Sequence, residues 1–302
     1  MRSTTTQHAP ESRRIATADA GIHILQAGAG PPVLFLHGFP ETLAMWRRVV
    51  PLLADRHTCV CADLRGYGSS DKPPSTPDHR PYSKVEMARE MIQVMDELGF
   101  DRFSVVGHDR GGRVGFRLAL DHPDRVERLV VLDVVPTLEA FERADARFAL
   151  AFWPWSLLAQ PEPLPEDLLA GNPEAVVEHA LREWGTERDV FPDAIVAAYV
   201  SGLRDSSTIH AICEEYRAAA TIDLEHDRAD RAAGRQVSCP VLVLWAAGGP
   251  LDEWYEAAGG PVGIWRTWAP AAEGRAISGG HFFAESNPVE TVAALNAFLT
   301  EL

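Results

Sequence analysis

The stretch "SVVGHDRGGRVGFRLAL", residues 104–120, places an acidic residue where strand-like sequence gives way to helix-like sequence. Gly107 and Gly111 stand two residues before and two residues after Asp109, which is the spacing of a nucleophile elbow. In such a turn the central side chain is exposed in a strained conformation, and the glycines let strand and helix approach closely. The pattern therefore predicts that Asp109 is a nucleophile rather than an ordinary helix-capping aspartate.

A carboxylate nucleophile is suited to attack on an alkyl carbon. Displacement of a halide or opening of an epoxide by Asp109 gives a plain ester, which water can then hydrolyse. Attack on an acyl carbon would give an anhydride instead. The aspartate therefore indicates carbon–halogen or epoxide chemistry and argues against an esterase.

Hydrolysis of such an ester needs a general base and an oxyanion site, and the chain has candidates for both. His281, in "GGHFF" before the last expected helix, is predicted to be the base. Asp133 ends the strand-like run "VVLD" and is predicted to orient this histidine, with Asp252 as its rival. The backbone N–H groups of Phe39 and Arg110 are expected to form the oxyanion hole.

Strand-like and helix-like segments alternate on both sides of the elbow. Residues 82–100 space their apolar side chains along one helical face. Continuous apolar runs that alternate with helices predict an α/β fold with a mostly parallel sheet and helices on both faces. The runs expected to be buried strands are "PPVLFLHG", "HTCVCADL", "DRFSVVGHD", "VERLVVLDVVP" and "CPVLVLWAAGG".

The alternation stops between residues 136 and 236, where the sequence is helical and irregular. Because about a hundred residues is too long for a loop in a compact domain, we predict an inserted helical cap over 136–236. Residues 1–135 and 237–302 are expected to form the two parts of the core, with a disordered tail over about residues 1–12.

The motifs "HGFPET", "DLRGYGSSDKP", "GHDRGGRV", "YRAAATIDLEHDRAD" and "GGHFF" resemble those of the α/β-hydrolase superfamily and, within it, the fluoroacetate and haloacetate dehalogenases. The resemblance covers nearly the whole chain after the tail. It implies an α/β-hydrolase fold and the conversion of haloacetate or a short 2-haloacid to a 2-hydroxy acid through an aspartyl ester. It also implies Asp109 as nucleophile, His281 as base and Asp133 as its acid, with no metal and no organic cofactor.

The same resemblance implies how the substrate is held. Arg110 and Arg113 match the residues that bind the substrate carboxylate, whereas haloalkane dehalogenases and epoxide hydrolases typically carry a tryptophan after the nucleophile. Trp155 and Tyr216 match two residues of the halide pocket, but Pro154 stands where that pocket has a histidine. Proline offers no donor to a leaving fluoride, so we expect weak defluorination and a smaller effect on chloride and bromide.

The composition limits the other possibilities. A chain of 302 residues with 46% hydrophobic residues can build a large core, and its formal charge of −15 argues against nucleic acid as a partner. It has neither a membrane-length apolar stretch nor the apolar segment of a secretory signal, so we expect no membrane partner and a cytoplasmic location. Its cysteines are expected to be buried free thiols; they are Cys59, Cys61, Cys213 and Cys239.

Two other functions stay open at this point. An epoxide hydrolase would share the nucleophile and base, and would use Tyr216 and Tyr199 to protonate the epoxide oxygen. A binding protein on the same fold would keep the pocket without turnover. The C-terminal helix and the tryptophan-rich segment 252–270 could contribute to a homodimer surface or equally to core or surface packing.

Overall fold

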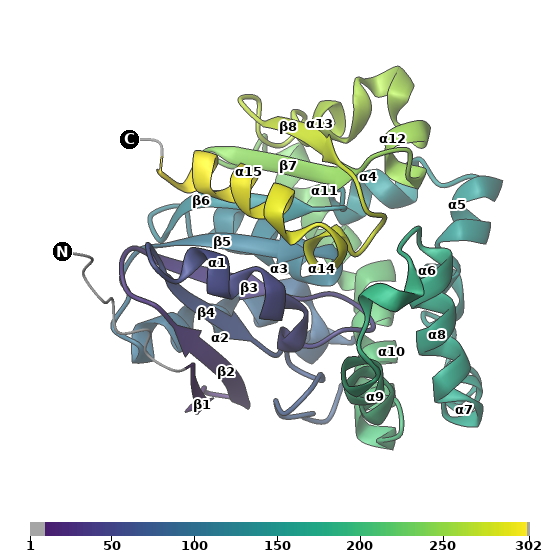
Figure 1. Cartoon of the computed structure of the whole chain (residues 1–302). Coiled ribbons are helices and arrows are strands. Elements are labelled where there is room, and N and C mark those ends of the chain that lie inside the picture. Colours follow the sequence, from purple (N-terminus) through teal and green to yellow (C-terminus); the bar gives the residue numbers. More distant parts are fainter. Residues whose placement is uncertain (1–9, 301–302) are drawn as a thin grey trace.

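The computed structural model describes residues 10–300; residues 1–9, which hold most of the expected tail, and residues 301–302 lie outside the described part. Within it the sheet has eight strands in the order β1-β2-β4-β3-β5-β6-β7-β8 (Figure 1). In this order the pairs β1–β2 and β2–β4 are antiparallel. All the following pairs, from β4–β3 to β7–β8, are parallel, which confirms the mostly parallel sheet. The strands are β1 Glu11–Ala16, β2 Gly21–Ala27, β3 Pro32–Leu36, β4 Thr58–Ala62, β5 Phe103–His108, β6 Val126–Leu132, β7 Val241–Ala246 and β8 Glu273–Ile277.

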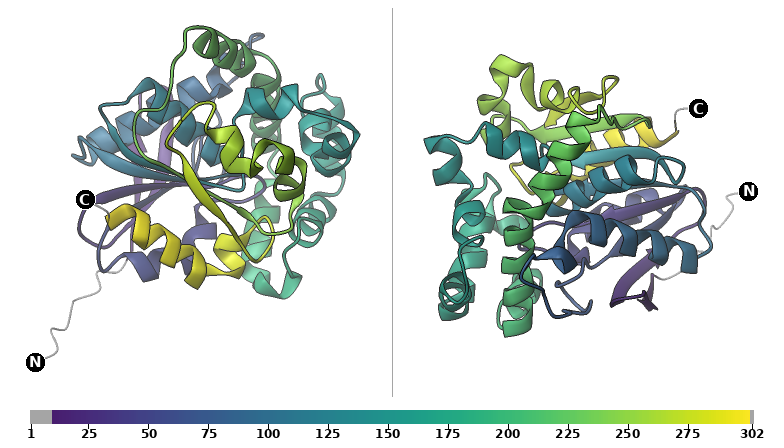
Figure 2. Two further views of the ribbon diagram at one scale, coloured as in Figure 1. Left: turned by 90° about the horizontal axis from the view of Figure 1, so that it is seen from above. Right: turned by 180° about the vertical axis from the view of Figure 1, so that it is seen from behind.

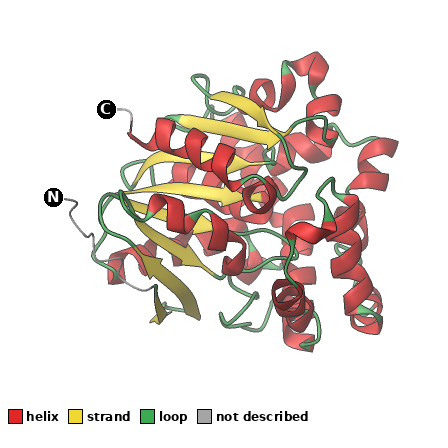
Figure 3. Ribbon diagram, viewed as in Figure 1, coloured by secondary structure: helices red, strands yellow, loops and turns green. Residues whose placement is uncertain are grey.

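Helices cover both faces of the sheet, as Figure 2 shows. The central strands are apolar on both faces, because alternate residues of one strand point into different cores. Val105 of β5 belongs to the core beneath α2 and α3, and its neighbour Val106 packs in the core beneath α15. Helices are red and strands yellow in Figure 3. The helices of the two core segments are α1 Val50–Leu53, α2 Lys84–Glu97, α3 Asp109–Asp121, α12 Pro250–Trp254, α13 Gly260–Trp265, α14 Phe283–Ser286 and α15 Pro288–Thr300, with the short 3-10 helices η1 Leu43–Arg48, η2 Arg80–Tyr82 and η4 Glu256–Ala258.

Between β6 and β7 the chain is helical and contributes no strand to the described structure, as the sequence predicts. Figure 1 shows α5–α10 beyond the carboxyl ends of the strands, which is the edge where open parallel sheets bind ligands. The division of the chain into a separate cap at residues 136 and 236 stays a prediction. The inserted elements are α4 Thr137–Glu142, α5 Ala146–Ala151, α6 Trp153–Leu157, α7 Leu164–Gly171, α8 Pro173–Glu183, η3 Arg188–Val190, α9 Asp193–Gly202, α10 Ser206–Ala220 and α11 Ile222–Ala232.

The tail predicted over about residues 1–12 overlaps the first strand of the structure by two residues. Strand β1 begins at Glu11, which pairs with Gln26 of β2. Because β1 is an edge strand and mostly exposed, its sequence "ESRRIA" carries no apolar run. A pattern search for buried strands therefore passes over it.

The tryptophan-rich segment 252–270 contributes to packing within the chain. Trp265 and Trp268 are fully buried, and the Trp265 indole donates to the carbonyl of Val134 at 2.7 Å. The cysteines are free, as predicted, and all are buried except the half-buried Cys239. None of the described helices is both long and apolar enough to cross a membrane.

Candidate active site

Asp109 is the first residue of α3, directly after β5, and its backbone is strained. Its φ angle is 43°, in the left-handed region that non-glycine residues rarely adopt. The two glycines are required by close approach: a Cβ at Gly107 would lie 2.4 Å from the Gly111 carbonyl oxygen, and one at Gly111 would lie 2.4 Å from that of Leu36. The elbow geometry expected from the sequence is present.

The Asp109 carboxylate is buried, and each of its oxygens has a donor. The Phe39 backbone N–H donates to Oδ2 at 3.2 Å, and Arg113 Nη1 donates to Oδ1 at 3.2 Å. Burial by itself raises the pKa of Asp109, but its electrostatic interactions with Arg113, His281 and Arg110 outweigh it and hold this pKa below its ordinary value. Asp109 is therefore an ionised carboxylate that lies beside one of the two predicted oxyanion donors.

His281 is bound to Asp133. Its Nδ1 lies 2.6 Å from Asp133 Oδ2, while Asp133 Oδ1 accepts from the Ala246 backbone N–H at 2.9 Å. The backbone N–H of His281 donates to the Trp184 carbonyl at 2.8 Å, which joins the histidine loop to the inserted helices. With Nδ1–H donating to the carboxylate, Nε2 of His281 is left to accept a proton.

Asp252, the rival of Asp133, is bound elsewhere. Its oxygens accept from Trp245 Nε1 at 2.8 Å and from the Gly248 backbone N–H at 3.0 Å. The structure brings Asp133 to His281 and uses Asp252 to brace the loop after β7.

Replacing Asp133 with asparagine should lower the turnover of any reaction in which His281 takes a proton, by about a hundredfold or more. The reason is that an amide cannot stabilise the charged imidazolium as a carboxylate does. Steady-state kinetics measure the effect. Asp252→Asn is the matched control and should stay within about threefold of the parent, and equal losses in both variants would contradict the assignment.

The two arginines lie beside Asp109, but aromatic rings cover them. The Arg110 guanidinium carbon lies 4.1 Å from the Tyr216 ring centroid, and that of Arg113 lies 4.4 Å from the Trp155 ring centroid. Both side chains are buried, and neither lines the cavity that Asp109 and His281 share. Arg110 Nη1 and Arg113 Nε have no hydrogen-bond partner among the described residues.

The two guanidinium groups differ in their electrostatic surroundings. Burial lowers the pKa of Arg113 to about 10, and Asp109 only partly opposes this. For Arg110 burial acts in the same direction, but the adjacent carboxylate of Glu215 outweighs it and raises the pKa above its ordinary value. Arg110 therefore has a strong anionic partner that the sequence reasoning missed.

A cavity of about 630 Å³ lies over Asp109 at the carboxyl ends of the strands. Asp109 and His281 line it together with Pro154, Trp155 and Tyr216 of the inserted helices. Thus Asp109, His281 and the residues predicted to form the halide pocket line one cavity. Further aromatic side chains line the same cavity, namely Phe152, Trp153 and Trp184.

His108, next to Asp109, is a further residue that the sequence reasoning missed. Its Nε2 lies 2.9 Å from the His281 carbonyl oxygen, and its Nδ1 lies 3.0 Å from a carboxylate oxygen of the buried Glu41. Burial lowers the pKa of His108, but Glu41 outweighs it and raises this pKa above its ordinary value. The sequence feature that could have identified His108 is its place directly before Asp109, in "GHD". The described residues contain no cluster of side chains that could hold a metal ion.

Comparison with known proteins places this geometry in a family. The α/β hydrolase fold family matches residues 31–288, most of the chain. This chain is an α/β hydrolase. The fold class predicted from its motifs is therefore confirmed, inserted helical region included.

Individual relatives of this α/β hydrolase include two kinds of enzyme. It is 44% identical over 295 residues to a fluoroacetate dehalogenase from Burkholderia sp, which covers 96% of this chain and 94% of the relative. It is 31% identical over 288 residues to a soluble epoxide hydrolase from Corynebacterium sp. (strain C12), with 88% and 89% covered. A solved structure described as an α/β hydrolase, from Nostoc sp PCC 7120, superposes with a TM-score of 0.93 at 44% identity and covers 97% and 99% of the two chains.

Proposed function

We propose that this α/β hydrolase removes halide from haloacetate or short 2-haloacids and yields 2-hydroxy acids through an ester on Asp109. The observation that carries the proposal is the set of groups around Asp109. An ionised carboxylate on an elbow lies beside two buried arginines with unpartnered N–H donors, in one cavity with a carboxylate-bound histidine. The similarity to a fluoroacetate dehalogenase supports it.

The proposed cycle has two chemical steps. The substrate carboxylate binds Arg110 and Arg113, and Asp109 attacks the α-carbon, so that a C–O bond forms as the carbon–halogen bond breaks and halide leaves. His281 then takes a proton from water that attacks the ester carbonyl, and it passes this proton to the departing oxygen as the bond between the Asp109 acyl carbon and that oxygen breaks and releases the hydroxy acid. Residues of the chain supply every group used, and no metal or organic cofactor takes part.

Backbone and side-chain donors near Asp109 are proposed to stabilise the negative charge that develops in each step. The N–H groups of Phe39 and Arg110 would bind the oxyanion of the second step. The Trp155 indole N–H and the Tyr216 hydroxyl have no hydrogen-bond partner among the described residues, and both side chains line the cavity, so they can donate to a halide. The cavity of about 630 Å³ has room for a substituent at C2 as well as for haloacetate itself.

Comparison of the release rates of different halides tests the role of Pro154. Pro154 is buried in the first turn of α6 and lines the cavity, and it offers no N–H donor. Fluoride release should therefore be slower than chloride and bromide release, and Pro154→His should raise it by about a hundredfold, because one donor to developing charge has about that effect. Ion-selective electrodes with fluoro-, chloro- and bromoacetate measure these rates.

Bromide release serves as the control in the same set of measurements. Bromide release should change much less in Pro154→His, since bromide leaves readily without strong donors. Fluoride release by the parent chain that matches its bromide release would contradict the role given to Pro154.

The alternative, an epoxide hydrolase, needs two tyrosines that face the substrate. The Tyr199 hydroxyl donates to Glu285 at 2.8 Å, and Tyr199 is buried without lining the cavity. This favours the haloacid over an epoxide. Styrene oxide and a glycidic acid in the same assay test the alternative, and tight ligand binding without product would favour a binding protein. The homodimer and the cytoplasmic location stay predictions.

A further inference from the structure

A second carboxylate, Glu215, lies behind the proposed substrate-binding arginines. Glu215 precedes Tyr216 on α10, and its side chain is buried beside Arg110. Arg110 Nε donates to Glu215 Oε1 at 3.1 Å, and Arg110 Nη2 donates to the Glu215 backbone carbonyl at 3.0 Å. One residue of the inserted helices therefore binds two of the three nitrogens of this guanidinium.

The third nitrogen, Arg110 Nη1, is buried and has no hydrogen-bond partner among the described residues. A buried cationic donor without a partner costs free energy, and such groups are rare in folded proteins. Because Arg110 is planar and rigid, binding of Nε and Nη2 by Glu215 also determines where Nη1 points. The Tyr216 ring, which lines the cavity, lies over this guanidinium, so a shift of that ring would open Nη1 to the cavity.

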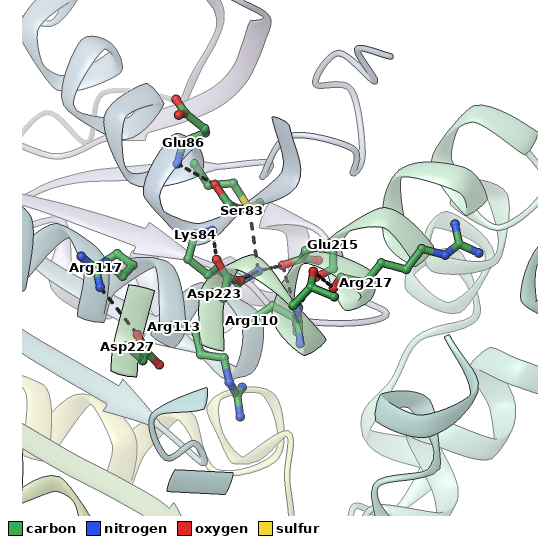
Figure 4. A network of polar contacts seen from close by, with 12 residues as sticks. Ser83, Lys84, Glu86, Arg110, Arg113, Arg117, Glu215, Arg217, Asp223 and Asp227 are labelled. Atoms are coloured by element: carbon green, nitrogen blue, oxygen red, sulfur yellow. Dashed lines mark hydrogen bonds and ion pairs between the residues drawn. The ribbon is translucent and has the colours of Figure 1, made fainter. Parts of the chain in front are cut away.

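Glu215 is itself bound from the core. Lys84 Nζ at the start of α2 donates to Oε1 at 2.7 Å, and the Tyr67 hydroxyl donates to Oε2 at 2.6 Å. Figure 4 shows Lys84, Glu215 and Arg110 in one network of polar contacts. The Glu215 carboxylate is thus a junction between the core and the inserted helices.

We infer that Glu215 is a positioning residue: it orients Arg110 so that Nη1 is presented to the substrate carboxylate, and Lys84 and Tyr67 hold it in that place. The inference rests on the proposed haloacid function. Glutamine cannot replace Glu215 in this role. Three donors bind the two carboxylate oxygens of Glu215, whereas the amide of glutamine has only one acceptor oxygen. The amide NH₂ would face a donor and turn the guanidinium away.

The test compares an anionic and a neutral substrate. Glu215→Gln should raise KM for bromoacetate by about tenfold to a hundredfold, the size of one lost charge-assisted hydrogen bond, with a smaller effect on kcat. With the neutral substrate 2-bromoacetamide, kcat/KM should change by less than about threefold, because no carboxylate is bound. An equal loss with both substrates would mean a purely structural role and would overturn the inference.

The matched control is Glu214→Gln. Glu214 is the preceding residue on α10 and is also buried, but it bonds to Arg217 and His79 and not to Arg110. Its replacement should leave the ratio of kcat/KM for the two substrates unchanged, whereas Glu215→Gln should shift it about tenfold or more. An equal shift in the Glu214 variant would also overturn the inference.

A binding measurement separates this inference from the proposed reaction. Titration calorimetry with glycolate needs no turnover, and its affinity should fall about tenfold or more in Glu215→Gln. If the parent chain releases no halide but glycolate binding falls in this way, the reaction is wrong and the positioning role stands. If the parent chain turns over bromoacetate and glycolate binds both proteins equally, the positioning role is wrong and the reaction stands. A parent chain that binds no glycolate would overturn the positioning role as well.

Discussion

Replacing Asp109 with alanine should abolish halide release, with a loss of about 10⁴-fold or more in kcat. Without the carboxylate no ester can form, and the groups that remain can only bind substrate. Halide release from bromoacetate, followed with an ion-selective electrode, measures the loss. Asp133, which also lines the cavity, cannot substitute, because it is bound to His281 and to the backbone of Ala246.

The control for Asp109→Ala is a measurement that shows that the variant is folded. Asp109 has a φ angle of 43°, and an alanine there keeps the strained backbone but removes the ion pair with Arg113. Thermal unfolding should therefore show a folded protein. A folded Asp109→Ala variant that still releases halide at more than a few per cent of the parent rate would contradict the nucleophile assignment.

Replacing His281 with glutamine should separate the two steps of the cycle. Alkylation of Asp109 needs no base, so it should proceed, whereas hydrolysis of the ester should slow by about 10²- to 10⁴-fold. Intact-protein mass spectrometry after exposure to bromoacetate should show one added carboxymethyl group, and peptide mapping should place it on Asp109. A variant that stays unmodified yet turns over would contradict the mechanism.

His122→Gln is a suitable control for the His281 variant. His122 caps the far end of α3 from Asp109 and does not line the cavity, so this variant should turn over normally and accumulate no ester.

The His281→Gln variant also isolates the pH dependence of alkylation. The pKa of Asp109 is held below its ordinary value, so the carboxylate stays ionised throughout the range above that value. The rate of ester formation should therefore be constant between about pH 5 and pH 8. Rapid-quench mass spectrometry over this range measures it, and a rate that falls towards pH 5 would contradict the lowered pKa.

The elbow could be predicted because its determinants are close together in the sequence. Gly107 and Gly111 flank Asp109 within one turn, and each is glycine because a neighbouring carbonyl leaves no room for a Cβ. The buried strands could be predicted for a similar reason, since their apolar runs are continuous. Strand β1 was passed over because an exposed edge strand has no such run.

The partners of the site residues were harder to predict, because they lie far apart along the chain. Asp133 and Asp252 both follow strands, so the sequence does not show which of them binds His281. The structure identifies Asp133, which lies 2.6 Å from His281 although 148 positions separate the two residues in sequence. Glu215 lies 105 positions from Arg110 in sequence. No local pattern marks it, because an acidic residue on a helix is usually solvated.

The sequence by itself determined the fold class, the elbow and the type of nucleophile, since these depend on residue types at short, regular spacing. Only the tertiary structure decided which carboxylate pairs with the histidine, that both arginines are buried under aromatic rings, and that a glutamate from the inserted helices holds one of them. The physical reason is that pairing and burial arise when strands and helices pack, which brings together side chains whose separation along the chain carries no signal.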